Sequence, residues 1–187
     1  MYLIAGLGNP GLQYTDTRHN VGFMLLDYLA DESNVSFSES KWKAQIAKTV
    51  IQDESVVLLK PQTFMNASGT AVAAVAHYYK LSTDNILVIH DDLDIPLGRI
   101  KIVSGGGTGG HKGVLSCIDH LGTKNFSRMK IGIDRPAAQI PPEKYVLSRF
   151  GADEHAIITE KMVAAVEGIR IFVQQGISAA MTVLNQK

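Results

Sequence analysis

The sequence predicts an α/β fold, a single-domain three-layer sandwich in which helices flank a twisted, mixed β-sheet. The chain has 187 residues, a length typical of one domain, which we expect to span 1–187. Apolar residues make up 45% of it, enough for a sizeable core. Short runs rich in Val and Ile alternate with longer segments of helical spacing, the pattern of strands interleaved with helices.

Six short segments, each bounded by Gly, Pro or Asp, are predicted to be strands. They are residues 2–6, 43–51, 56–60, 85–91, 99–103 and 127–133. The run NILVIH is apolar almost throughout, as is typical of a strand covered on both faces. The run KAQIAKTV alternates more, which favours an edge strand or a strand with one buried face.

Helices are predicted between these strands. Residues 20–30 carry apolar side chains at the spacing of one helix face. Ser68 is expected to cap the segment GTAVAAVAHYYK, and Asp153 the long segment EHAIITEKMVAAVEGIRIFVQQ. The segment HKGVLSCIDHL ends at Gly122, a residue type that favours the position just after a helix. A shorter helix is expected from Ser178.

Composition excludes several classes of protein. No apolar run approaches the roughly 20 residues of a membrane-spanning helix. The N-terminus lacks a basic flank and passes directly into a glycine turn, so we expect no signal peptide. The single cysteine, Cys117, excludes an internal disulfide and a cysteine-based zinc site, and its apolar neighbours favour a core position. We therefore expect a cytoplasmic protein.

Charge is distributed unevenly along the chain although its net value is zero. Residues 1–96 hold 6 Lys or Arg against 11 Asp or Glu, a balance of −5. Residues 97–149 hold 9 against 3, a balance of +6, and residues 150–187 hold 3 against 4. The local excess of basic residues in the middle of the chain is compatible with a polyanionic partner.

The stretch GLGNPG has glycines at 6, 8 and 11, the G-x-G-x-x-G spacing of dinucleotide-binding loops. That function needs a helix that starts within the loop and faces its amino end to the pyrophosphate. Here Pro10 removes one backbone donor, and the next helix is predicted to start only near Asn20. The alternative is a tight turn, since Asn-Pro-Gly suits one. A turn alone leaves His19, beside an arginine and an asparagine, without an explanation.

Four sequence blocks resemble bacterial peptidyl-tRNA hydrolases. They are GLGNPGLQYTDTRHNVGF, PQTFMNASG, HDDLDIPLGRIKI and GGGTGGHKG, followed by FSRMKIGIDRP and YVLSRF. Together they cover nearly the whole chain in the order of that family. The resemblance implies an enzyme that cleaves the ester between a peptide and the 3′ ribose of tRNA, without a metal or cofactor. It also implies a monomer with no DNA or membrane partner.

The resemblance assigns a role to each polar residue of these blocks. His19 matches the general base, and imidazole suits this task because it titrates near pH ~6.5. Asp91 matches the carboxylate that orients the base, with water in the place of a serine nucleophile. Asn9 and Asn66 match amides of the site, which can bind a carbonyl or a peptide without titrating. The loops that carry them, 8–20, 61–68, 90–98 and 104–113, are expected beyond the carboxyl ends of the strands.

The family also implies peptide contacts from the residues Tyr14, Met65, Asn66, His111 and Lys112, and phosphate contacts from the basic residues Lys101, Arg128, Lys130, Arg135 and Lys144. Two positions depart from the family pattern. Lys112 stands where asparagine is usual, and a lysine cannot accept a hydrogen bond. Asp134 stands where glycine is common, beside the expected tRNA face.

Simpler interpretations remain open for single residues. Asn9 could form a turn, Asn66 could start a helix, and Met65 could belong to the core. The acidic run Asp91, Asp92 and Asp94 could be a solvated loop or a divalent-cation site. At the level of function, the alternatives are a module that binds the tRNA acceptor end without chemistry and a nucleotide-dependent oxidoreductase.

Overall fold

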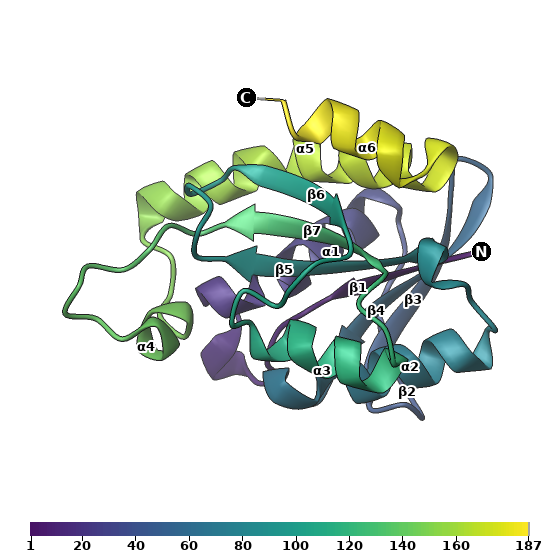
Figure 1. Cartoon of the computed structure of the whole chain (residues 1–187), viewed down its shortest axis with the longest axis horizontal. Coiled ribbons are helices and arrows are strands. Elements are labelled where there is room, and N and C mark those ends of the chain that lie inside the picture. Colours follow the sequence, from purple (N-terminus) through teal and green to yellow (C-terminus); the bar gives the residue numbers. More distant parts are fainter. Residues whose placement is uncertain (187) are drawn as a thin grey trace.

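The computed structural model describes residues 1–186, which form one seven-stranded sheet with helices on both faces (Figure 1). Lys187, the last residue of the domain expected from the sequence, lies outside the described residues. The strands are β1 (Tyr2–Gly6), β2 (Ser38–Ser40), β3 (Ala44–Ile51), β4 (Glu54–Pro61), β5 (Ile86–Asp92), β6 (Ile100–Ser104) and β7 (Ser127–Gly132). The helices are α1 (Val21–Glu32), α2 (Ser68–Tyr78), α3 (Lys112–Leu121), α4 (Pro142–Val146), α5 (Ala152–Gln175) and α6 (Ile177–Leu184).

The sheet is mixed, with the strand order β2-β3-β4-β1-β5-β7-β6. The four central strands β4, β1, β5 and β7 run parallel, whereas β2 and β3 at one edge and β6 at the other pair in antiparallel fashion. The predicted fold class is thereby confirmed. Because the parallel strands end at a common edge, the loops that follow them can converge on one site.

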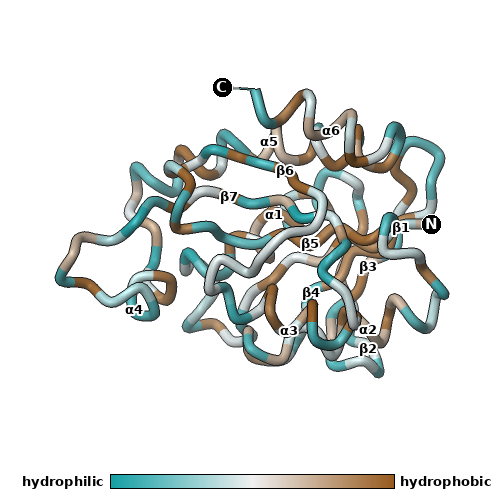
Figure 2. Tube along the Cα trace, in the orientation of Figure 1, coloured by the Kyte–Doolittle hydropathy of each residue, from teal (hydrophilic) through white to brown (hydrophobic). Residues whose placement is uncertain are grey.

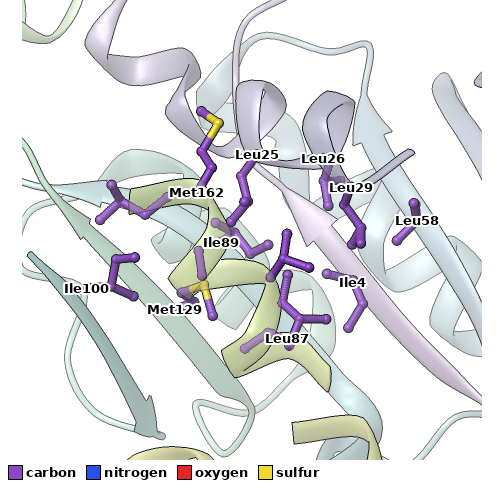
Figure 3. Packing of buried hydrophobic residues seen from close by; sticks show 14 of the residues in the cluster. Ile4, Leu25, Leu26, Leu29, Leu58, Leu87, Ile89, Ile100, Met129 and Met162 are labelled. Atoms are coloured by element: carbon purple, nitrogen blue, oxygen red, sulfur yellow. The ribbon is translucent and has the colours of Figure 1, made fainter. Parts of the chain in front are cut away.

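Two apolar layers enclose the sheet. Helices α1, α5 and α6 cover one face, and α2 and α3 cover the other. Side chains alternate between the faces: Ile4 belongs to the same cluster as Leu25 and Met162 (Figure 3), while Leu3 and Ala5 belong to the opposite cluster. Figure 2 shows hydrophobic residues concentrated along the central strands. Since both faces are covered, these strands are apolar throughout, as predicted for NILVIH.

Two expectations from composition can be compared with the structure. Cys117 is fully buried between α2, α3 and the sheet, and burial raises the pKa of its thiol to about 12, as expected of a core residue. No helix among residues 1–186 is both long and apolar enough to span a membrane.

Two short elements escape prediction from the sequence. The three residues of β2, all Ser or Glu, form the outer edge of the sheet and are not buried, so they carry no apolar pattern. Helix α4 has five residues, too few for helical spacing to be recognised, and begins just after Pro141. The element α4 is important below because it forms part of the functional cleft.

Both predicted helix caps are wrong. Ser68 is the first residue of α2 and is fully buried, and Ala67 precedes it without a side-chain cap. Asp153 lies inside α5, whose cap position is Gly151. The carboxylate of Glu154 accepts a hydrogen bond from the Gly151 amide at 2.7 Å, so the acid that satisfies this helix end reaches back from within the helix.

The glycine spacing at the N-terminus serves helix packing. A Cβ atom on Gly6 would lie 2.3 Å from the carbonyl oxygen of Gly22, and one on Gly8 would lie 2.7 Å from the ring of Phe23. These glycines let the start of α1 pack directly on the end of β1. Because α1 begins only at Val21 and its first turn closes over the glycines, the loop is not built as a dinucleotide cradle.

One of the four expected loops starts from the opposite edge of the sheet. Because β6 is antiparallel to β7, Ser104 pairs with Ser127 at the amino end of β7. The glycine loop, residues 105–111, therefore has to run back along the sheet face to reach the start of α3 at the carboxyl edge (Figure 1). The loop does follow the carboxyl end of its own strand, as predicted, but that end lies at the opposite edge of the sheet, and only the far end of the loop reaches the edge where the other three loops lie.

Candidate active site

A cleft of about 320 Å³ lies at the carboxyl edge of the parallel strands. It is lined by residues from four segments that the sequence analysis singled out and from a fifth that it missed. In chain order these lie within residues 9–19, 64–66, 90–93, 108–112 and 142–147. Loops far apart in sequence thus meet where the parallel strands end, as the topology requires.

Asp91, at the end of β5, binds two imidazole rings through one oxygen. Its Oδ1 lies 2.8 Å from Nδ1 of His19 and 3.0 Å from Nε2 of His111. The backbone amide of Val114 donates to Nδ1 of His111 at 3.2 Å, which places the ring proton of neutral His111 on Nε2. Both rings can then donate to the carboxylate, and Nε2 of His19 is left with a free lone pair.

Electrostatics keep this carboxylate ionised. Burial alone would raise the pKa of Asp91, but the charges of His111 and His19 and their hydrogen bonds outweigh burial and hold the pKa well below its usual range. His90 lies beneath, 2% exposed, and its Nδ1 donates to the backbone carbonyl of Asp91 at 2.7 Å. Burial, reinforced by His111, lowers the pKa of His90 to about 3, so this ring stays neutral.

Asn9 is held in one orientation by its neighbours. The side chain of Asn20 bonds the backbone of Asn9 twice, accepting from its amide and donating to its carbonyl, both at 2.9 Å. The side-chain oxygen of Asn9 accepts from the Met65 amide at 2.8 Å. The Nδ2 group of Asn9 is therefore the end of the amide that can donate into the cleft, which Asn9 lines.

Four of the five residues expected to contact the peptide line the cleft, and Tyr14 does not. Asn66, His111 and Lys112 line the cleft. Met65 lines it too, yet it is only 5% exposed and belongs to the core, so the core interpretation is confirmed and the contact with a peptide stays a prediction. Tyr14 does not line it: a hydrogen bond from its amide to Gly11 closes an outward turn, and the Tyr14 prediction is not supported by the geometry.

Arg128 is wrongly predicted as a phosphate contact. Its side chain is 1% exposed, and its guanidinium donates to the carbonyl oxygens of Gly107 at 2.6 Å and Gly106 at 2.5 Å. Sequence alternation correctly placed it on one face of β7, but the glycine loop crosses that face and covers it. Arg128 therefore fastens the loop that leads to His111.

The other four basic residues reach the surface. Lys130 donates to Asp92 at 2.9 Å and stands opposite Lys101 in the β6–β7 register. Arg135 forms an exposed ion pair with Asp94 at 2.5 Å, and Lys144 is exposed on α4. Lys101 and Lys130 are half-buried neighbours on the face beside the glycine loop.

The two departures from the family pattern differ in consequence. Lys112 is the first residue of α3, exposed at the cleft. Asp134 has a φ of 60°, in the left-handed region that glycine adopts most readily, which explains why glycine suits this position. Its side chain accepts from the Leu97 amide at 3.1 Å and so fastens the loop after β5.

An apolar wall is the main feature that sequence reasoning missed. Phe64, 61% exposed, and Leu93 line the cleft together with Val146 and Leu147 from the region of α4. The signal available was the segment PPEKYVL, in which a proline at the first helical position precedes helix-forming residues. A cleft with one polar and one apolar side suits a peptide substrate.

The fold and the cleft define an α/β protein equipped for hydrolysis, in which an ionised carboxylate holds an imidazole beside an amide donor. The family model for peptidyl-tRNA hydrolase matches residues 3–187, and the chain belongs to that family.

Individual relatives agree with this assignment. A peptidyl-tRNA hydrolase from Desulforamulus reducens is 46% identical over all of this chain and 90% of its own length. One from Desulfitobacterium hafniense is 44% identical, with both chains covered completely. A crystal structure of peptidyl-tRNA hydrolase from Acinetobacter baumannii superposes with a TM-score of 0.93 at 34% identity, covering 99% of this chain and 94% of that one.

The low pKa of His90 predicts a pH-dependent stability. Between its ordinary pKa of 6.5 and its folded pKa of about 3, the unfolded chain binds a proton that the folded chain does not. The free energy of unfolding should therefore fall on acidification through this window, with a contribution from His90 approaching ~1.4 kcal/mol per pH unit. The variant His90→Phe should show a shallower slope between about pH 4.5 and 6 in urea unfolding.

The exposed His155 on α5 offers the matched control, since His155→Phe should retain the slope of the parent protein. An unchanged slope in His90→Phe would contradict the assignment of a neutral, buried His90.

Proposed function

We propose that the protein hydrolyses the ester that joins a peptide, or an N-blocked aminoacyl group, to the 3′ ribose of tRNA, and so recycles tRNA from prematurely released peptidyl-tRNA. His19 is the general base, and Asp91 orients it. Asn9 and Asn66 bind the peptide and its ester carbonyl. The observation that carries this proposal is the 2.8 Å contact of His19 with Asp91, which leaves Nε2 of His19 free beside the Asn9 amide.

The imidazole takes a proton from water while the water oxygen attacks the ester carbonyl. Asp91 stays ionised and 2.8 Å away, so it stabilises the imidazolium that forms on His19. When the tetrahedral intermediate collapses, the same proton passes to the departing 3′ oxygen of the ribose. The products are a peptide with a free carboxyl group and a tRNA with a free 3′ hydroxyl.

The amide of Asn9 supports binding and stabilisation of the oxyanion. Because its oxygen is engaged by the Met65 amide, its nitrogen is available to donate to the carbonyl oxygen as negative charge develops there. Asn66 is exposed in the cleft and can contact the peptide backbone. Lys112 adds a cationic donor at the start of α3, toward the carbonyl or a phosphate.

Water is the nucleophile favoured by the lining of the cleft. Among the residues that line it, only Thr108 carries a hydroxyl group, and none is serine, cysteine or tyrosine. Thr108 lies on the glycine loop, where its hydroxyl accepts from the Gly110 amide at 3.2 Å, and none of the described hydrogen bonds joins that hydroxyl to a histidine ring. A covalent intermediate on the protein would need an activated nucleophile beside the base.

Catalysis without a metal agrees with the hydrogen bonding. His19, Asp91 and His111 lie close enough to resemble a set of metal ligands. However, the ring nitrogens that face Asp91 are both donors in the arrangement described above. A metal ligand must present a lone pair, so an ion would have to displace both hydrogen bonds.

The basic residues on the surface are proposed to bind the acceptor stem and 3′ end of tRNA. Lys101 and Lys130 lie on one face of the sheet, Arg135 follows on the segment that leads to α4, and Lys144 lies on α4 itself. Contacts to phosphate supply affinity without reading sequence, which suits an enzyme that acts on many tRNAs. Arg128 is excluded from this set because the glycine loop covers it.

The base assignment predicts that His19→Ala lowers turnover by about 10²–10⁴-fold, because water loses its proton acceptor. The assay is cleavage of N-blocked aminoacyl-tRNA, and tRNA affinity should be retained because the phosphate contacts lie elsewhere. The variant His77→Ala, which removes an exposed histidine at the end of α2, is the matched control. Turnover near the parental rate in His19→Ala would refute the assignment.

The parental activity should also survive EDTA, and its complete loss would refute catalysis without a metal.

The contrast between Lys101 and Arg128 predicts different salt dependence. If Lys101 contacts a phosphate, Lys101→Met should reduce the log–log slope of tRNA affinity against salt by about 0.7–0.9. Arg128→Met should leave that slope unchanged but lower the free energy of unfolding by roughly 2–4 kcal/mol, because the glycine loop loses two charge-assisted hydrogen bonds from a buried side chain. A reduced salt slope in Arg128→Met would restore it as a phosphate contact.

A further inference from the structure

The segment that carries the apolar wall stands apart from the layers of the fold. Helix α4 lies in the long connection between β7 and α5 and extends beyond the sheet (Figure 1). Pro142, Val146 and Leu147 of this region line the cleft. None of the residues of α4 is fully buried, and only Tyr145 and Val146 pack partly against the core. Polar contacts add to this limited packing in holding the wall in place.

Arg18, the residue before the general base, supplies several of these contacts, beside the hydrogen bond from the Tyr145 hydroxyl to the Ile133 carbonyl at 2.7 Å. Its side chain is buried, and its Nη1 group donates to the hydroxyl of Ser148 at 2.8 Å and to the carbonyl of Arg149 at 2.5 Å. The guanidinium also stacks on the ring of Tyr145, 4.3 Å from its centroid. These three partners form the end of α4 and the turn that follows it.

Glu154 completes the connection to the body of the protein. Both of its carboxylate oxygens accept from Nη2 of Arg18, at 2.6 and 2.7 Å. The same carboxylate accepts from the Gly151 amide at the start of α5, a helix packed on the sheet. A backbone hydrogen bond joins the same two segments, because the Arg18 amide donates to the Ser148 carbonyl at 3.1 Å. Arg18 thus joins the His19 turn, α4 and α5 in one network.

We propose that Arg18 and Glu154 are positioning residues that hold the α4 wall over the cleft and thereby set its affinity for the peptide part of the substrate. This inference rests on the proposed hydrolysis of peptidyl-tRNA. A planar guanidinium is suited to the task because it can bind a carboxylate with one edge and backbone carbonyls with another. Lysine carries a single ammonium group, which cannot reach all of these partners at once.

His19 has attachments of its own. Asp91 binds its ring, and the next residue, Asn20, bonds the backbone of Asn9 in both directions. These contacts do not pass through Glu154. Loss of the Glu154 carboxylate should therefore loosen α4 while the base and its partner stay in place, so binding should suffer more than the chemical step.

The test compares Glu154→Gln with Glu32→Gln. Glu32 pairs with Arg170 at 2.6 Å and joins α5 to α1 away from the cleft, so it is a matched glutamate–arginine pair. In Glu154→Gln we expect KM for an N-blocked aminoacyl-tRNA with a large apolar side chain to rise about tenfold, the factor that corresponds to ~1.4 kcal/mol. Its kcat and the pH profile of kcat should stay within about twofold of the parent, and Glu32→Gln should match the parent throughout.

Hydrogen exchange provides a readout independent of activity. Peptides that cover residues 142–150 should exchange faster in Glu154→Gln than in the parent or in Glu32→Gln. If Glu154→Gln fails to fold, Arg18→Lys gives the same two measurements. Unchanged exchange and unchanged KM would overturn the proposal, as would a fall in kcat at constant KM. If the parent does not cleave the ester, the proposed function fails, whereas exchange still decides whether Arg18 and Glu154 hold α4.

Discussion

Oδ1 of Asp91 accepts hydrogen bonds from His19 and His111, and the arrangement of the cleft depends on this shared oxygen. Burial penalises the charge of Asp91, and the interactions with both rings outweigh that penalty and hold the pKa of this carboxyl well below its usual range. The backbone amide of Val114, at the start of α3, fixes the tautomer of His111 and thereby the direction of its hydrogen bond. The start of α3 therefore directs the hydrogen bond that His111 donates to the same carboxylate that binds His19.

Polar groups fasten the surrounding loops in addition to the apolar packing of residues such as Met65, Val146 and Phe150. Arg128 binds two carbonyls of the glycine loop, and Arg18 binds the turn after α4, so a guanidinium fastens each of these walls. Asn20 does the same for the loop that carries Asn9. Loops that line an open cleft bury little apolar surface. Hydrogen bonds from polar side chains, several of them charge-assisted, therefore help to hold these loops in place.

How much the sequence could predict varied with the kind of signal. The core strands and long helices carry regular apolar patterns, and the position of Asp91 at the end of the apolar strand β5 followed from such a pattern. His19, Asn9 and Asn66 could be placed at one site through the order of motifs and the rule that parallel strands end at a common edge. Arg128 was misassigned because side-chain alternation says nothing about a distant loop that folds over the strand.

The remaining gaps have equally local causes. Helix α4 and β2 are too short to show a period, so the apolar wall of the cleft was missed. Sequence alone also did not reveal that Arg18 faces Glu154, 136 positions away, because only tertiary structure brings the two together. The tautomer of His111 depends on a single backbone contact, which no pattern of residue types encodes.

The central claim is that neutral His19 carries its proton on Nδ1 and offers Nε2 as a base, because Asp91 and His111 leave no other arrangement. Long-range ¹H–¹⁵N correlation of protein with ¹⁵N-labelled histidine, at about pH 8 where imidazole is ordinarily neutral, measures this directly. The account predicts a proton on Nδ1 of His19 and on Nε2 of His111. A proton on Nε2 of His19 would contradict it, since that nitrogen could not then accept a proton from water.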